Sequence, residues 1–231
     1  MLRTSAAVGG GLVFAGSLLF FAWSYFFGFD TPAVGAGVLL PTLIDVALFS
    51  GFALHHSIFA RSGLKAAVSR AVSPALERTT YVWIASVLFI VVCLAWRPVE
   101  GVLWSLDGPA AWILRGLQFG AAVLTVASAR HLDILDLAGV RQALNLPPSR
   151  PIKLDDHGPY GLVRHPIYLC WLFLVWPAPV MNATRLVFAA TSTLYLVLAI
   201  PFEERDLHKT FGEAYRRYSD KVKFRILPGL Y

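Results

Sequence analysis

The chain has 231 residues, of which 57% are hydrophobic and 15% are charged, and its mean hydropathy is +0.62. Soluble domains carry about 25% charged residues, so this composition excludes an ordinary soluble protein and indicates one embedded in a membrane. The formal net charge of +6 does not indicate nucleic-acid binding, because no basic face exists outside the loops between apolar segments. The two cysteines lie far apart inside apolar runs, which excludes a disulfide framework or a cysteine-based zinc site.

Six apolar segments predict an all-α integral membrane protein with about six transmembrane helices. The first segment reaches the roughly 20 residues that span a bilayer, which favours a retained span over a cleaved signal peptide. The fifth segment is short and ends near Pro177 and Pro179. The fifth and sixth segments are therefore expected to form a tight helical hairpin. The segments cover residues 9–29, 38–60, 81–96, 110–129, 167–180 and 186–202.

Lysine and arginine are distributed unevenly among the loops between these segments. If the N-terminus lies in the cytoplasm, 17 of the 20 Lys and Arg residues fall on the cytoplasmic side. This bias is typical of cytoplasmic loops. We therefore expect both termini and the two polar clusters described next to lie on that side.

The first polar cluster is residues 156–168, DHGPYGLVRHPIY, which stand directly before the fifth segment. Its glycines and prolines predict a turn whose backbone N–H groups are accessible to a ligand. Pro166 suits the first position of a helix, which places Arg164 and His165 at the helix N-terminus, where an anionic group such as a carboxylate is favoured. Tyr160 and Tyr168 add aromatic faces that can contact a cation.

The second cluster is the acidic pair Glu203 and Glu204, which follows the last apolar segment. Carboxylates at this position can accept hydrogen bonds from an amine or from ribose hydroxyls. Together the two clusters suggest a zwitterionic ligand that carries a sugar. Beyond the acidic pair, Leu207, Phe211, Tyr215 and Tyr218 recur at three- and four-residue spacing and predict an amphipathic helix. We expect it to lie on the membrane surface or to cover the cytoplasmic loop, with Gly212 indicating close packing.

The two clusters resemble paired motifs of a known superfamily. GPYxxxRHPxY at residues 158–168 and EExxL…FGxxYxxY at residues 203–218 are similar to those of the isoprenylcysteine carboxyl methyltransferase and phospholipid methyltransferase superfamily. FALHHSIFAR at 52–61, ERTTYVWIAS at 77–86 and DLAGVRQ at 136–142 resemble the nurim-like group, which includes bacterial methanethiol S-methyltransferases. Two departures from the family pattern are HLDILDLA before GVRQ and Val222-Lys223 in place of a Val-Pro pair. They leave the expected cofactor site intact and leave the acceptor substrate open.

This resemblance implies one membrane methyltransferase domain, with a four-span part at 1–129 and a cofactor-binding core at 130–231. It implies a bacterial inner-membrane location, S-adenosyl-L-methionine as cofactor, and a small thiol or lipophilic acceptor that enters from the bilayer. The expected cofactor-binding residues are His157, Gly158, Tyr160, Arg164, His165, Tyr168, Glu203 and Glu204. The candidates for the acceptor side are His55, His56, Arg61, Arg141 and Gln142.

Several alternatives stay open at this level. The acceptor could be an isoprenylated cysteine carboxylate or a phospholipid amine, or the chain could be a structural nurim-like membrane protein. A bis-histidine haem would need His55 or His56 with His131. His131, Asp133 and Asp136 look like a metal set, but they fit a solvated loop better, so no metal is expected. Asp45 lies inside the second segment and should face the protein interior, because a charge exposed to lipid is costly.

Overall fold

The structure is a computed structural model that describes residues 2–31, 33–59, 74–129, 140–144, 146–147, 154 and 156–231. By its contacts the chain divides into two compact units. Unit 1 comprises Met1–Leu103, Asp133–Ser149 and Met181–Val187, and unit 2 comprises Trp104–Leu132, Arg150–Val180 and Phe188–Tyr231. The single methyltransferase domain with parts 1–129 and 130–231 stays a prediction.

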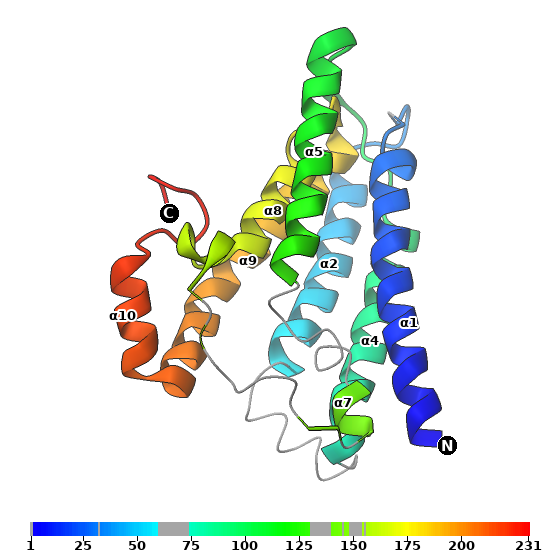
Figure 1. Ribbon diagram of the computed structural model, residues 1–231. Helices are drawn as coiled ribbons and strands as arrows, with labels where there is room; N and C mark the ends of the chain where they lie inside the picture. Colours follow the sequence, from blue (N-terminus) through cyan, green and yellow to red (C-terminus); the bar gives the residue numbers. More distant parts are fainter. Residues whose placement is uncertain are drawn as a thin grey trace. The chain divides into compact units, whose positions relative to one another are not determined.

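Unit 1 contains helices α1 (Leu2–Trp23), α2 (Leu39–Phe59), α4 (Pro74–Ala95) and the short α7 (Val140–Ala143). Figure 1 shows α1 and α4 side by side. Two glycines allow this packing, because a Cβ at Gly9 or Gly10 would lie 3.0–3.1 Å from the Trp83 indole. The indole Nε1 donates a hydrogen bond of 2.9 Å to the carbonyl oxygen of Ala6, which joins the two helices.

A buried arginine binds the backbone that follows the C-terminal end of α1 within unit 1. A π-helical turn, η1 (Ser24–Gly28), follows α1, and the last carbonyls of a helix lack partners inside it. Arg185 is completely buried and donates hydrogen bonds to the carbonyl oxygens of Tyr25 and Phe26. Its guanidinium also pairs with Asp30. This network ties the residues just after α1 to residues 181–187.

Unit 2 contains α5 (Gly108–Ala129), α8 (Pro166–Val175), α10 (Glu213–Lys221) and most of α9 (Ala183–Phe211). α5 packs against α8, and Gln118 Nε2 donates to the carbonyl oxygen of Leu174 over 2.9 Å. α8 is joined to α9 by two indole hydrogen bonds, from Trp171 to Ser192 (3.0 Å) and from Trp176 to Thr193 (2.9 Å). These contacts fix the helix that begins with the RHP turn against the helix that carries the glutamate pair.

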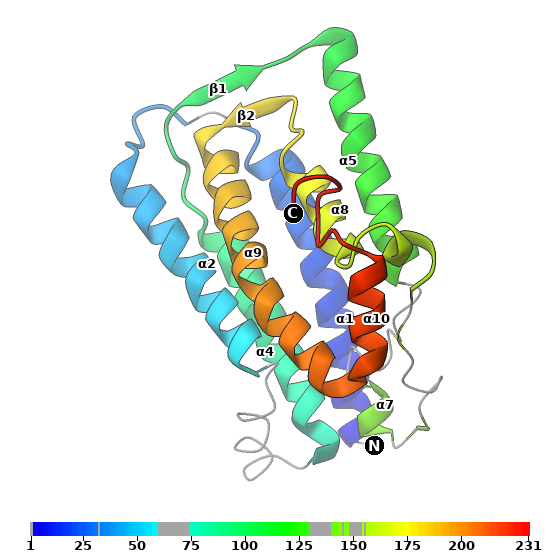
Figure 2. The ribbon, with the colours of Figure 1, turned by 90° about the vertical axis from the view of Figure 1, so that its left-hand side faces the viewer.

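A two-stranded sheet was not predicted. Strands β1 (Val102–Ser105) and β2 (Val180–Asn182) pair with each other, as Figure 2 shows. β2 stands directly between Pro177 and Pro179 on one side and the start of α9 on the other. The prolines therefore end the short helix, and the chain continues as an extended strand rather than as a tight helical turn.

The expected all-α membrane fold is confirmed, with a corrected number of spans. Among the described residues, five helices are long and apolar enough to cross a membrane: Thr4–Gly28, Leu39–Ile58, Leu76–Ala95, Gly108–Ala129 and Ala183–Phe211. The fifth predicted span, residues 167–180, begins in α8, which has only 10 residues. At about 1.5 Å per residue such a helix is about 15 Å long, half of a hydrocarbon core of about 30 Å. Asp45 is completely buried, as expected, and accepts the Arg97 N–H over 2.7 Å.

The tail differs from the predicted continuous helix. α9 runs through Glu203 and Glu204 as far as Phe211, and α10 begins at Glu213. Gly212 between them has φ 51°, a left-handed conformation that glycine adopts most readily, and a Cβ there would touch nothing within 4 Å. The reason for the glycine is therefore backbone conformation, and the expectation of close packing was wrong.

Candidate functional site

The GPYG sequence forms the turn that the glycines and proline predicted. It is a 3-10 helix, η2 (Gly158–Gly161), in which Gly158 has φ 57°. α10 covers this turn: the Tyr218 hydroxyl donates a 2.8 Å hydrogen bond to the carbonyl oxygen of Tyr160. Tyr215 and Tyr218 are buried in a cluster with Val222, against which Leu154, Leu207 and Phe211 pack. The apolar face of α10 is thus directed at its own unit, which supports the loop-covering alternative.

Arg164 and Glu204, 40 residues apart in the sequence, form the centre of the site. α8 begins at Pro166, with His165 as its N-cap residue, as the RHP motif predicted. The Arg164 Nε donates to Glu204 Oε1 over 2.6 Å, and both side chains are about nine-tenths buried. The RHP turn and the glutamate pair therefore belong to one site within unit 2.

Residues 222–231 complete this site, and the sequence did not predict their role. Arg164 Nη1 donates to the carbonyl oxygens of Val222 and Lys223, at 2.9 and 3.0 Å. The backbone N–H groups of Arg164 and His165 donate to the carbonyl oxygens of Phe224 and Arg225, at 2.9 and 2.8 Å. The expectation that the amides of Arg164 and His165 are free to bind an anion at the N-terminus of α8 is therefore wrong, because the C-terminal segment already accepts their hydrogen bonds.

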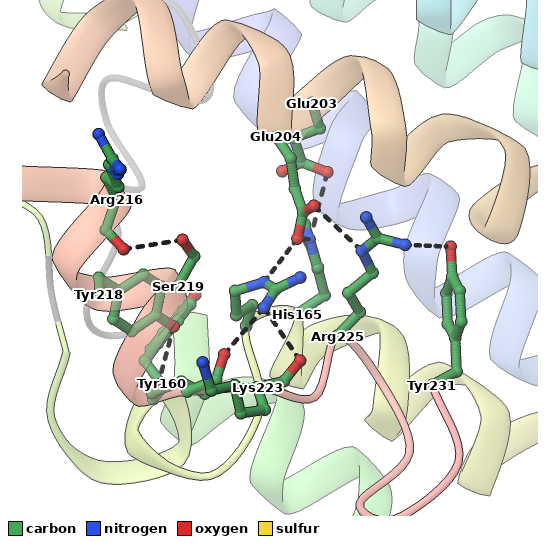
Figure 3. A network of polar contacts seen from close by, with 12 residues as sticks. Tyr160, His165, Glu203, Glu204, Arg216, Tyr218, Ser219, Lys223, Arg225 and Tyr231 are labelled. Carbon is green, nitrogen blue, oxygen red and sulfur yellow. Dashed lines mark hydrogen bonds and ion pairs between the residues drawn. The ribbon is translucent and has the colours of Figure 1, made fainter. Parts of the chain in front are cut away.

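Arg225 is a second cation on the same carboxylate. Its Nε donates to Glu204 Oε2 over 3.0 Å, and its Nη1 donates to the Tyr231 hydroxyl over 3.2 Å, as Figure 3 shows. Partial burial alone would lower the pKa of Arg225, but the Glu204 carboxylate outweighs it and raises that pKa. Each Glu204 oxygen is thus paired with a guanidinium, and this carboxylate holds the RHP turn, α9 and the C-terminal segment together.

Glu203 has a different environment from its neighbour. Its side chain is 45% exposed, whereas that of Glu204 is 10% exposed. The Tyr168 hydroxyl donates to Glu203 Oε2 over 2.7 Å, and His165 Nδ1 lies 3.6 Å from the same oxygen. The Tyr168 ring stacks on the His165 ring, with centroids 5.2 Å apart and planes inclined by 11°. The Glu203 carboxylate is therefore positioned by Tyr168 and still accessible from outside the protein.

Two buried polar atoms of the site lack a hydrogen bond within the described part of the chain: His165 Nε2 and the Tyr215 hydroxyl. His165 Nε2 lies 3.4 Å from Glu204 Oε1 without hydrogen-bond geometry. Burial raises the pKa of the Tyr215 phenol, and the Glu204 carboxylate acts in the same direction. Buried polar groups usually have partners, so these two atoms point to a polar ligand.

The residues predicted for the acceptor side are placed as follows. His55 and His56 lie in the last turns of α2 in unit 1, where the Tyr81 hydroxyl is 2.8 Å from His56 Nδ1. Arg141 is in α7, and its guanidinium donates to the carbonyl oxygen of Pro147. Arg61, the side chain of Gln142, and His131, Asp133 and Asp136 lie outside the described residues.

The predicted cofactor residue His157 is at the edge of the site. Its side chain is 82% exposed, and Nδ1 lies 2.9 Å from Asp156. Among the residues that the structure describes, no group of three or more His, Cys, Asp or Glu side chains could hold a metal ion.

Comparisons with known proteins identify the family. A methanethiol S-methyltransferase of Mycobacterium tuberculosis is 34% identical over 200 residues, which cover 85% of this chain and 82% of that protein. Methanethiol S-methyltransferase 1 of Bradyrhizobium diazoefficiens is 36% identical over 203 residues, 86% of this chain and 70% of the relative. The chain belongs to the methanethiol S-methyltransferase family.

Nurim of Sus scrofa is a more distant relative of this family member, 27% identical over 78% of the chain and 73% of nurim. The predicted nurim-like branch is thereby confirmed. No family model and no solved structure matches the chain.

Sequence reasoning missed Arg225, Tyr231 and the hydroxyl of Tyr215 in this methanethiol S-methyltransferase family member. Arg225 lies in a segment without periodicity, so no pattern connects it to Glu204. Tyr215 was part of the quoted motif, and only its role in the site was missed. Its spacing of three residues from Tyr218, on one face of α10, was the available signal.

Proposed function

We propose that this protein transfers a methyl group from S-adenosylmethionine to methanethiol at the membrane and forms dimethyl sulfide. The observation that carries the proposal is the convergence of Arg164, Glu204 and Arg225 in a family whose named members are methanethiol S-methyltransferases. The names of these relatives favour a thiol over the isoprenylated cysteine or phospholipid acceptors that the motifs left open. They likewise favour an enzyme over a purely structural nurim-like protein.

The residues of the site fit an adenosyl sulfonium donor. S-adenosylmethionine carries a sulfonium cation, an amino group and ribose hydroxyls. Glu203 offers an accessible carboxylate that Tyr168 holds in place. His165 Nε2 and the Tyr215 hydroxyl are buried polar atoms for which the hydroxyls and amine supply partners. We propose that these three residues bind the donor and that Glu204 positions them.

The donor supplies an activated methyl group, so the protein has to align the reactants and exclude water. Correct alignment of two reactants contributes about 7–11 kcal/mol to lowering such a barrier. A thiol must also lose its proton, because the thiolate is the nucleophile.

We propose that the acceptor reaches the site from the bilayer, that both termini are cytoplasmic and that the membrane is a bacterial inner membrane. The distribution of basic residues and the bacterial relatives support this arrangement.

The test is a methyl-transfer assay with the purified protein in detergent. S-adenosylmethionine and methanethiol are supplied, and dimethyl sulfide is measured by gas chromatography. We expect product from the unaltered protein and from Asp206→Asn, a matched control on α9 that removes an exposed carboxylate paired with Lys209 within one helical turn. Glu203→Gln should lower the rate. Farnesylated cysteine supplied in competition should not be methylated, and methylation of it instead of the thiol would contradict the proposed acceptor.

A further inference from the structure

The C-terminal segment, residues 222–231, returns to the proposed donor site as a closed turn within unit 2. The backbone N–H groups of residues 225–227 all donate to the backbone oxygen of Tyr231, at 2.9, 2.9 and 3.1 Å. The Arg225 guanidinium carbon lies 5.2 Å from the centroid of the Tyr231 ring, and Nη1 donates to the Tyr231 hydroxyl over 3.2 Å. Ile226 is buried, which anchors the turn. Arg225 is therefore presented to the site in a fixed conformation (Figure 3).

Arg225 holds two groups of the site at once. Its Nε donates to Glu204 Oε2 over 3.0 Å, and its backbone oxygen accepts the N–H of His165 over 2.8 Å. The other carboxylate oxygen, Oε1, accepts from the Arg164 Nε over 2.6 Å. Both oxygens of Glu204 thus accept a charge-assisted hydrogen bond from a guanidinium, and these two bonds set the orientation of the carboxylate plane.

The fixed carboxylate does not bond to the histidine nitrogen beside it. His165 Nε2 is buried and lies 3.4 Å from Glu204 Oε1, but among the described residues it makes no hydrogen bond. An imidazole N–H and a carboxylate this close ordinarily form a hydrogen bond, because an unsatisfied buried polar atom is costly. The carboxylate does not turn to this nitrogen because Arg164 and Arg225 hold it on both sides. Removal of Arg225 would free Oε2 and with it the rotation of the carboxylate.

We propose that Arg225 is a positioning residue for the methyl donor: it holds the Glu204 carboxylate and so keeps His165 Nε2 available for a polar group of S-adenosylmethionine. This inference rests on the proposed function, in which His165 binds the donor. Arg225 acts through its two neighbours and does not touch the reacting atoms. Without its guanidinium, the Glu204 carboxylate turns and accepts a hydrogen bond from His165 Nε2–H. The donor then has to displace that bond, and its affinity falls.

The test measures the affinity for S-adenosylmethionine by calorimetry and the kinetic constants of methyl transfer. Arg225→Ala should raise the Kd and the KM for the donor about tenfold, the equivalent of one charge-assisted hydrogen bond. It should leave kcat at saturating donor unchanged, because an interaction that serves binding alone changes KM. The Arg225 side chain is 35% exposed, so a guanidinium ion from solution can reach the space that the variant leaves. Ethylguanidinium should restore the affinity and ethylammonium should not, because only the planar guanidinium matches the carboxylate.

A double-mutant cycle separates positioning from a purely structural role. In a His165→Phe background, Arg225→Ala should cost no further donor affinity, because the histidine through which Arg225 acts is gone. Equal losses in both backgrounds would overturn the proposal. Tyr231→Phe keeps the ring and removes one hydrogen bond to Arg225, so it should raise the Kd about threefold. It carries the same cycle if Arg225→Ala does not fold, and an unchanged Kd in Tyr231→Phe would then contradict the proposal.

The matched control is Arg216→Ala, which removes an exposed arginine of α10 that pairs with Glu213 within one helical turn. Its Kd for the donor should equal that of the unaltered protein and should not respond to ethylguanidinium. If the unaltered protein binds no S-adenosylmethionine, the proposed function fails. If it binds the donor and Arg225→Ala binds it equally well, or if ethylguanidinium does not restore the loss, only this inference fails.

Discussion

Arg185 in unit 1 and Arg164 in unit 2 are both largely buried guanidinium groups, but their surroundings differ. Arg185 is bound by the carbonyl oxygens of Tyr25 and Phe26 and by Asp30. Arg164 contacts Glu204, which shares its charge with Arg225 and adjoins the accessible Glu203 and His165 Nε2, an atom without a hydrogen bond among the described residues. A network whose groups satisfy one another is structural, whereas one with an accessible carboxylate and orphaned polar atoms is prepared for a ligand.

The largest effect is expected from Glu204→Gln, which leaves two guanidinium groups without their carboxylate. Breaking a buried pair by neutralising one partner costs about 3–5 kcal/mol. We expect a clear fall in Tm in detergent and loss of measurable S-adenosylmethionine binding by calorimetry. Asp206→Asn is the control and should change neither quantity. A variant with normal Tm and normal donor affinity would remove the distinction between the two networks.

Arg185→Met should affect stability alone. The carbonyl oxygens of Tyr25 and Phe26 lose their donors, which costs about 1–3 kcal/mol for buried groups. Asp30 is one-third exposed, so water can solvate it. We expect a lower Tm and an unchanged KM for S-adenosylmethionine in the folded fraction. A large rise in that KM with unchanged Tm would show that the unit 1 network takes part in binding.

Glu203→Gln should produce the reverse pattern. The carboxylate is 45% exposed, so its removal should leave Tm within the error of the measurement. Loss of a charge-assisted hydrogen bond to the donor corresponds to about 1.4 kcal/mol, a tenfold weaker affinity. Isothermal titration of the purified variant measures it. An unchanged affinity together with a reduced Tm would assign Glu203 to the structural group.

The smallest effect is expected from Tyr215→Phe and depends on pH. The folded protein raises the pKa of Tyr215, so it favours the neutral phenol. That contribution is fully present below the ordinary tyrosine pKa of about 10 and is lost as pH rises above it. Unfolding curves between pH 8 and 11 should therefore show a decline that is shallower in Tyr215→Phe. Equal slopes in both proteins would contradict the assignment.

The helical membrane fold and the pairing of the two motifs could be predicted because both depend on local patterns. Long apolar runs specify the spans, and Pro166 specifies the start of α8. The length of α8 was overestimated, because the apolar run continues through Pro177 and Pro179 into β2. Hydropathy alone does not distinguish helix from strand in such a run.

The C-terminal half of the site could not be predicted from patterns. The carbonyl oxygens of residues 222–225 bind Arg164 and His165 through the backbone, and backbone contacts leave no residue-type signature. The environment of Glu204 depends on Arg225. This arginine lies in a C-terminal segment without sequence periodicity, so no pattern predicts its contact with α9. The sequence showed a glycine at position 212, but not that the helix breaks there. The structure explains the glycine by its left-handed backbone conformation and not by a lack of space for a side chain.

The central claim is that the methyl donor binds at the site formed by the RHP turn and the glutamate pair. Ultraviolet crosslinking of radiolabelled S-adenosylmethionine to the purified protein, followed by proteolysis and mass spectrometry, tests it most directly. Label in peptides from residues 156–168 or 203–218, suppressed by Glu203→Gln, is the predicted result. Label confined to peptides from residues 2–103 would contradict the account.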